Sequence, residues 1–172
     1  MPKQTKGRKV KLMKHETELL ADGKLVEITH ESSTSRWLRA ESLSADDYPD
    51  GYTTVYRPMG DLEVKYLIEN GTLPDTQPYQ AIIEGPVVGR AYAEKYLKGM
   101  KKVDTAPTTV VEFCIPSTLV EELMAIQHKV EDGAISMGLG DKAGGGLPLF
   151  NAALRTPPSS FRLVLVKRRP TK

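Results

Sequence analysis

The sequence predicts an α+β domain in which short strands and helices alternate. Runs of β-branched and aromatic residues, apolar residues at helical spacing, and Pro or Gly at the ends of both support it. The 172 residues are 40% hydrophobic and 27% charged, proportions typical of one globular domain. No apolar run approaches the ~18 residues of a membrane span, so no transmembrane segment is expected. The lone Cys114 excludes an intrachain disulfide and a multi-cysteine zinc site.

The first third of the chain gives weak signals. Residues 1–10 are polar and basic without periodicity, which is typical of a disordered tail. Residues 11–30 have two strand-like runs around an Asp-Gly turn, which indicates a short hairpin. Residues 31–51 predict an irregular or partly helical connection, with Trp37 and Leu38 as its anchor on the core. We therefore divide the chain into a basic N-terminal tail with an irregular or hairpin extension, 1–51, and a folded domain, 52–172.

From residue 52 onward the elements are better defined. Each predicted strand is rich in β-branched residues, and each predicted helix has an apolar face. Pro58, Gly71 and the pair Gly85-Pro86 end three of them. The predicted strands are 52–57, 80–84, 108–115 and 160–166; the predicted helices are 61–70, 88–96, 116–126 and, in part, 147–154; the Gly-rich stretch 133–146 is predicted to be a loop.

The net charge of +2 conceals an uneven distribution. Residues 1–14 hold six basic groups and residues 160–172 hold five, and neither end has an acid. Residues 15–159 hold 13 basic and 22 acidic groups, a balance of −9. An acidic body with basic ends is not a broad nucleic-acid surface. We interpret the ends as solvated tails, the second of which begins on the predicted strand 160–166 and runs past it.

Three places have side chains suited to chemistry. Arg57 follows Tyr56 at a predicted strand end, and its planar guanidinium can donate two parallel hydrogen bonds to a phosphate. The alternative is a surface arginine. Tyr92 and Tyr96 share a helical side and could stack on a flat heterocycle; the alternative is core packing. Glu131 could bond a ribose hydroxyl or stabilise positive charge during glycosidic cleavage; the alternative is a solvated charge.

Other chemistries find less support. The Gly-rich stretch lacks the Gly-Lys-Ser/Thr that closes a P-loop. The three histidines, at 15, 30 and 128, have no metal-like spacing. Cys114 falls in the middle of a predicted strand, where a thiol is buried and inert. We therefore predict no metal site.

Taken in chain order, several blocks resemble the ADP-ribosyltransferase-like toxin domains, especially the TreTu type found at the C-terminal ends of Rhs-type polymorphic toxins. The most specific part is Gly-Leu-Gly followed by an apolar-Phe-Asn element. The blocks are 55–59 with Glu63 and Leu67, 70–74, Gly85-Pro86 with Tyr92-Ala93 and Tyr96, 128–131, 135–140 and 147–151.

This resemblance implies a split, two-sheet ADP-ribosyltransferase-like fold with short helices and with NAD in the cleft between the sheets. It makes 52–172 the catalytic domain. Arg57, with Tyr56 beside it, would grip the NAD phosphate or ribose. Tyr92 or Tyr96 would flank the nicotinamide, and Glu131 would be the catalytic carboxylate.

The resemblance also implies a function. The chain would be a toxin or effector domain that transfers ADP-ribose from NAD, its substrate, to a protein or nucleic-acid acceptor. The producing bacterium would secrete or inject it, and it would act in the recipient-cell cytoplasm; a cognate immunity protein is a further expected partner. Two alternatives stay open: an NAD glycohydrolase toxin, and a non-enzymatic binding module on the same scaffold.

Overall fold

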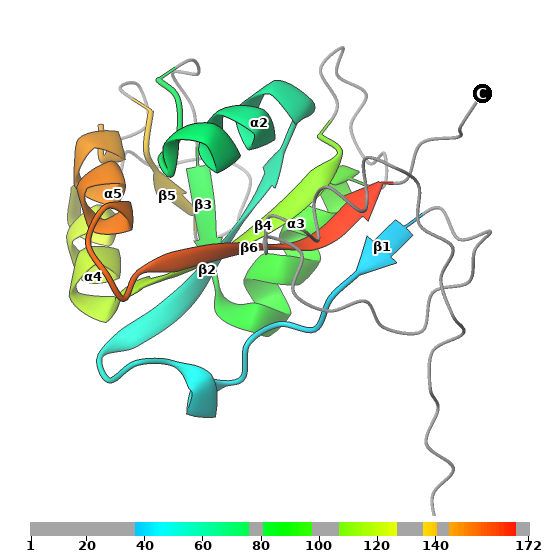
Figure 1. The fold of residues 1–172 in the computed structure, drawn as a ribbon. Helices are drawn as coiled ribbons and strands as arrows, with labels where there is room; N and C mark the ends of the chain where they lie inside the picture. Colours follow the sequence, from blue (N-terminus) through cyan, green and yellow to red (C-terminus); the bar gives the residue numbers. More distant parts are fainter. Residues whose placement is uncertain (1–36, 76–80, 98–106, 127–135, 141–144, 168–172) are drawn as a thin grey trace, which may run out of the picture.

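The structure is a computed structural model that describes residues 37–75, 81–97, 107–126, 136–140 and 145–167. These residues form an antiparallel sheet of six strands with four α-helices (Figure 1). The predicted α+β class is confirmed. No helix among the described residues has the length and apolar character that crossing a membrane requires.

The elements follow the predicted order, with one strand before them and one inside the Gly-rich stretch. The strands are β1 (Trp37–Arg39), β2 (Tyr52–Met59), β3 (Ala81–Glu84), β4 (Thr109–Pro116), β5 (Ser136–Gly138) and β6 (Ser160–Lys167). The helices are α2 (Asp61–Asn70), α3 (Arg90–Leu97), α4 (Ser117–Ile126) and α5 (Leu147–Leu154), with a 3-10 turn η1 (Ala45–Asp47) and a π-helical turn η2 (Gly85–Gly89).

The sheet has the order β1-β6-β4-β2-β3-β5, and its ladders differ greatly in length. β2 pairs with β4 along its whole length, from Tyr52 to Met59. It pairs with β3 only through Val55↔Glu84 and Tyr56↔Ile83. We call this short junction the β2–β3 seam. The described strands therefore form one hydrogen-bonded sheet, and the predicted split into two sheets is not confirmed.

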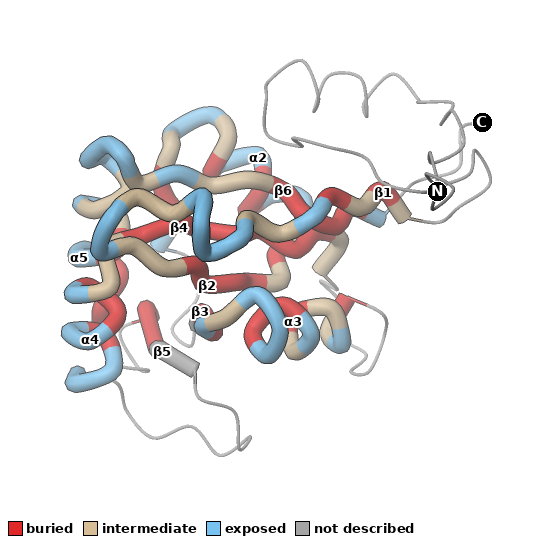
Figure 2. Tube along the Cα trace, turned by 90° about the horizontal axis from the view of Figure 1, so that it is seen from below, coloured by how far each residue is buried: buried red, intermediate tan, exposed pale blue. Residues whose placement is uncertain are grey.

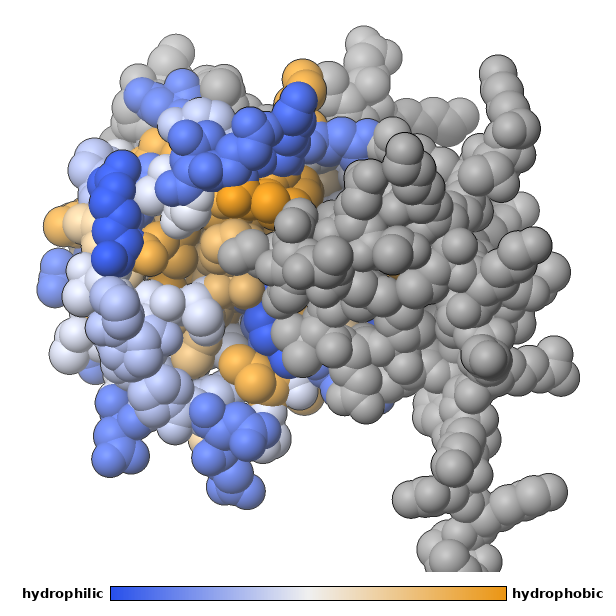
Figure 3. Space-filling model, in the orientation of Figure 1, coloured by the Kyte–Doolittle hydropathy of each residue, from blue (hydrophilic) through white to orange (hydrophobic). Residues whose placement is uncertain are grey.

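Helices cover both faces of the sheet. α2, α4 and α5 pack on one face, where Phe113 of β4 meets Phe150 of α5 with ring centroids 5.1 Å apart. α3 packs on the other face against Tyr56 and Val110. Figure 2 shows the buried positions running along the central strands β2 and β4. In Figure 3 the outer side of α2 is mostly hydrophilic, and hydrophobic surface shows directly below it. Leu62 of this helix is nevertheless exposed, and Val64 and Leu67 are the α2 residues buried in the core.

Residues 37–51, which we assigned to the extension, belong to the same structural unit. β1 pairs with the outer side of β6, and Leu38 and Ala40 are fully buried in the main core. The predicted anchor at Trp37 and Leu38 is confirmed. The sheet unit therefore extends at least as far as Trp37. The predicted disordered tail, 1–10, and hairpin, 11–30, lie outside the described residues.

The predicted loop over the Gly-rich stretch is wrong at residues 136–138, which form β5. Ser-Met-Gly has no β-branched run, so local sequence does not indicate a strand; pairing with β3 forms it. Gly146 precedes α5 where a Cβ would come 2.3 Å from the Leu123 side chain. The glycine at this position therefore allows α5 to approach α4 closely.

Candidate functional site

Arg57 lies on β2 and points to the face that carries α2. Its Nε donates to Glu63 Oε1 at 2.8 Å, and its Nη2 donates to Glu63 Oε2 at 3.0 Å. Both side chains are more than nine-tenths buried. The sequence brings them together locally, because α2 begins two residues after β2 ends and Glu63 falls in its first turn. Arg57 is therefore a buried, ion-paired side chain, so the surface alternative is wrong.

Tyr56 points to the opposite face, since consecutive strand residues alternate. Its hydroxyl donates to Glu112 at 2.5 Å. Glu112 is fully buried and also accepts from Arg162 Nε at 3.0 Å and from the backbone N–H of Leu43. Burial, and then the hydrogen bond to Glu112, raise the pKa of Tyr56 well above its usual range. The Tyr56 hydroxyl is thus part of a closed internal network.

Tyr92 and Tyr96 form the pair that their spacing predicts. Their hydroxyl oxygens lie 2.9 Å apart, and their rings, inclined at 59°, have centroids 5.2 Å apart. They belong to α3, which packs on the face to which Tyr56 points. The three tyrosines were expected to share an NAD site with Arg57, but the structure does not bring them together with it. The sheet lies between them, because strand alternation sends Tyr56 and Arg57 to opposite faces.

Glu131, the predicted catalytic residue, lies outside the described residues, as do the three histidines. Along the chain it lies five residues after the end of α4 at Ile126 and five residues before the start of β5 at Ser136. Ser136 pairs with Ile83 of β3, next to Glu84. The strand that follows Glu131 in sequence is therefore a direct neighbour of β3.

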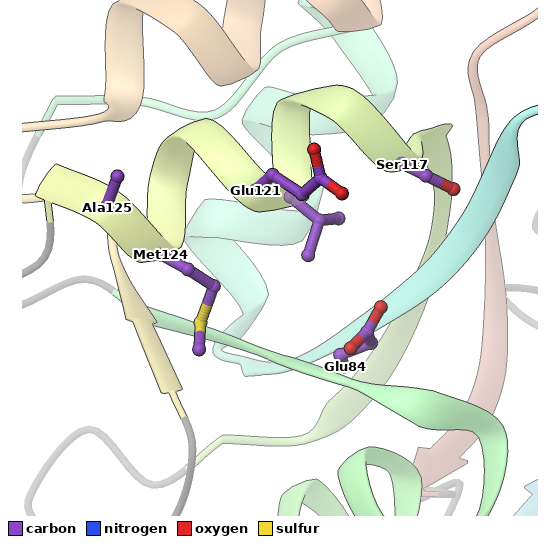
Figure 4. A pocket seen from close by; sticks show the side chains of 6 residues that line it. Glu84, Ser117, Glu121, Met124 and Ala125 are labelled. Carbon is purple, nitrogen blue, oxygen red and sulfur yellow. The ribbon is translucent and has the colours of Figure 1, made fainter.

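A pocket of about 590 Å³ lies between the end of β3 and α4 (Figure 4). Glu84 enters it from β3, and Glu121 approaches the same hollow from α4. Glu84 is paired with Val55 across the seam, so it projects on the same face of the sheet as Arg57. The lining residues are Glu84, Ser117, Val120, Glu121, Met124 and Ala125.

The pocket combines acidic and apolar groups. Both glutamates are exposed, and Glu84 accepts only a long hydrogen bond, 3.5 Å, from Thr53 Oγ1. Val120 and Met124 supply apolar surface beside the Ser117 hydroxyl. Such a lining favours a positively charged group with an apolar stem and repels an anion.

Sequence reasoning missed this pocket. Glu84 does carry a weak signal, because it ends a strand just before Gly85-Pro86. Glu121 carries none, because an exposed acid on a helix is ordinary. Only the packing of α4 beside β3 places the two carboxylates around one hollow.

The described part of the chain contains no group of three or more His, Cys, Asp or Glu side chains arranged to hold a metal. Cys114 is buried on β4, as predicted. Burial, and then the nearby Glu112 charge, raise the pKa of its thiol, which disfavours the reactive thiolate.

Comparisons of the chain with protein-family models, with curated proteins and with solved structures gave no match. Any functional conclusion therefore rests on the residues themselves and on their arrangement.

Proposed function

We propose that this chain is a toxin-type ADP-ribosyltransferase domain that transfers ADP-ribose from NAD to a macromolecular acceptor in a recipient cell. One observation carries the proposal. Three blocks that resemble the family, far apart in sequence, have described residues on or directly beside three adjacent strands. These residues are 55–59 on β2, Gly85-Pro86 after β3, and 136–140 on and after β5. Residues that act on one ligand have to converge in this way.

The split scaffold with NAD between two sheets is part of this proposal. It is supported by the β2–β3 seam, where two residue pairs join β3 and β5 to the rest of the sheet. On the other side of β2 the ladder to β4 runs over eight residues. A sheet so narrowly joined can diverge on either side of the seam.

The proposed chemistry is heterolysis of the bond between the ribose C1′ and nicotinamide. Nicotinamide leaves as a neutral molecule with the bonding electron pair, and the ribose becomes oxocarbenium-like. The Glu131 carboxylate stabilises that positive charge. A nucleophile of the acceptor then bonds to C1′ and releases one proton.

Arg57 is the proposed ligand of the NAD phosphates. Its Nε and Nη2 donate to Glu63, so a phosphate would share the guanidinium with that carboxylate. The Glu63 carboxylate holds the guanidinium in place and neutralises most of its charge. Arg57 would therefore orient a phosphate by hydrogen bonding more than it would attract one by charge. Tyr56, Tyr92 and Tyr96 lie on the other side of the sheet and have no part in the proposed NAD site.

The test uses the full chain, NAD labelled in the adenine part, and an extract of a bacterial recipient cell. We expect label on a macromolecule and a loss of about 10²–10³-fold in rate for Glu131→Gln. Glu122→Gln, an exposed acid on α4, is the control and should leave the rate unchanged. Free ADP-ribose without labelled acceptor would establish a glycohydrolase instead. No NAD turnover at all would leave the binding-module alternative and overturn the proposal.

A further inference from the structure

We infer that Asn151 of α5 is a positioning residue of the proposed transferase. It ties the segment after α2 to α5, and in this way it fixes where α2 and Arg57 lie relative to β3 and β5. The inference rests on the proposed function and adds to it a residue that acts through two helices, not through contact with NAD.

The contact made by Asn151 joins two parts of the chain that are far apart in sequence. Its Nδ2 donates to the Leu73 carbonyl oxygen at 3.0 Å, and its Oδ1 accepts from the Leu73 backbone N–H at 2.9 Å. One side-chain amide thus satisfies both backbone groups of a residue that is 2% exposed, as a neighbouring strand would. An apolar side chain at position 151 would take both of these bonds away from buried backbone groups, which is costly.

Leu73 leads back to Arg57 through α2. The helix ends at Gly71, which is in the left-handed conformation with φ 74°, so Leu73 follows the last turn closely. Glu63, in the first turn of the same helix, forms the buried ion pair with Arg57. Asn151 therefore anchors the carboxyl end of the helix whose amino end holds Arg57.

The first turn of α5 is bonded to the chain after β5. The backbone N–H of Leu147 donates to the Leu139 carbonyl oxygen at 3.0 Å, and Leu139 is fully buried one residue beyond β5. Next to Asn151, Phe150 packs on Phe113 of β4 with ring centroids 5.1 Å apart, which fixes the helix on the sheet. α5 therefore connects β5 with the end of α2 by a route that does not pass through the β2–β3 seam.

This route matters because the seam is narrow. Two residue pairs join β2 to β3, so the backbone ladder alone gives little control over the position of β3 and β5 relative to Arg57. In the proposed transferase Arg57 orients the NAD phosphates, and Glu131, five residues before β5 along the chain, acts at the ribose. A misplacement of about 1 Å between reacting groups can cost about 10²-fold in rate, so the connection through Asn151 should affect the chemical step.

The first experiment measures steady-state NAD turnover by the full chain and by Asn151→Ala. We expect kcat to fall about tenfold or more while KM for NAD stays within about threefold, because the Arg57 ion pair remains and only the relative position of the two sides is lost. Asn70→Ala is the matched control, since its exposed amide donates to the Tyr66 carbonyl of its own helix. This control should leave both constants within about twofold of the wild type.

The second experiment measures position without NAD. Spin labels are attached at Lys65→Cys on α2 and Glu84→Cys on β3, both exposed positions, while the native Cys114 is buried. Pulsed electron paramagnetic resonance then gives the distribution of distances between the two labels. We expect a broader distribution when Asn151→Ala is added and an unchanged one when Asn70→Ala is added.

A second variant covers the case in which Asn151→Ala does not fold, which a urea titration decides. Asn151→Asp keeps an acceptor for the Leu73 N–H but has no amide donor for the Leu73 carbonyl oxygen. It should therefore move kcat and the distance distribution in the same direction as Asn151→Ala.

The outcomes separate positioning from structure and from the function itself. If a folded Asn151 variant is less stable but keeps the wild-type kcat and distance distribution, Asn151 is only structural and the inference is wrong. If KM for NAD rises while kcat stays unchanged, Asn151 acts in NAD binding and the inference is also wrong. If the distances broaden as expected but the wild type turns over no NAD, Asn151 does position α2 relative to β3, and the transferase proposal fails.

Discussion

The two halves of the sheet differ in how they are held together. β6, β4 and β2 are joined by long ladders along the buried core, and β1 adds to β6 through three residue pairs. β3 and β5 join them through two residue pairs, at Val55 and Tyr56, and join each other through three. The long half is built as a scaffold. The short half contributes Glu84 to the pocket, whose other lining residues lie on α4. Of the blocks that resemble the family, Gly85-Pro86 follows β3 and 136–140 begins with β5, whereas 55–59 lies on β2 in the long half.

Glutamates show the same contrast. Glu112, in the long half, is fully buried and receives hydrogen bonds from Tyr56, Arg162 and the Leu43 backbone. Glu84, in the short half, is exposed and receives one weak bond. A buried, fully bonded carboxylate holds structure, whereas an exposed one beside a hollow is available to a ligand.

The largest effect on stability is expected at Glu112. Glu112→Gln removes the negative charge that compensates Arg162, whose side chain is only 14% exposed. We expect the free energy of unfolding, measured with urea, to fall by about 3–5 kcal/mol. Glu122→Gln, on the surface, should change it by less than about 0.5 kcal/mol. A similar small change for Glu112→Gln would remove the distinction between the two kinds of glutamate.

The buried pair of Arg57 and Glu63 offers a sharper test. Arg57→Met leaves Glu63 buried without its partner and should cost about 3 kcal/mol. The double variant Arg57→Met/Glu63→Met replaces both charges with apolar side chains and should recover most of that loss. The same urea titrations measure both.

The double variant also separates the two roles of Arg57. If it folds but binds NAD at least tenfold more weakly, Arg57 is an NAD ligand as well as a structural residue. If it folds and binds NAD normally, Arg57 is structural only.

A substitution at Gly89 should destabilise the short half of the sheet without destabilising the long half. A Cβ there would come 2.5 Å from the carbonyl oxygen of Ile83 and 2.7 Å from that of Glu84. Gly89→Ala should therefore cost about 1–3 kcal/mol. Hydrogen exchange should accelerate at the amides of β3 and much less at those of β4.

The matched control is Gly60→Ala, where a Cβ has nothing within 4 Å. Equal acceleration in β3 and β4 for Gly89→Ala would mean that the two halves unfold as one unit, contrary to the comparison.

The smallest expected effect is on the pH dependence of stability. It concerns Glu94 of α3, which forms an ion pair with Arg39 of β1 in the long half. Burial disfavours the charged form of Glu94, but the hydrogen bonds and charges of Arg39 and Arg90 outweigh it and hold the Glu94 pKa below its ordinary value of 4.5. The ionised carboxylate thus stabilises the fold above about pH 4.5, and this contribution is lost as the pH falls through the lowered pKa.

Glu94→Gln should therefore cost about 1 kcal/mol at pH 7. Its free energy of unfolding should fall less steeply than that of the wild type below pH 4.5. Parallel pH profiles for the two proteins would show that Glu94 does not contribute in this way.

Local sequence predicted most of the elements but little of the candidate site. The strands β2 and β4 follow from β-branched runs, and α2 follows from its apolar spacing and its Asn-Gly stop, because such signals are contained within one element. The pairing of Tyr92 with Tyr96 was predictable for the same reason, since residues four apart share a helical side. β5 was not predictable, because its strand form depends on a partner about 50 residues away.

The sequence by itself determined the α+β class, the order of the elements and the acidic body with basic ends. Only the tertiary structure decided which side chains meet. It placed Arg57 against Glu63 and Tyr56 against Glu112 on opposite faces, joined residues 37–51 to the sheet, and brought Glu84 and Glu121 to one pocket. The physical reason is that periodicity states which face of an element is apolar, whereas strand order and helix packing decide what that face contacts.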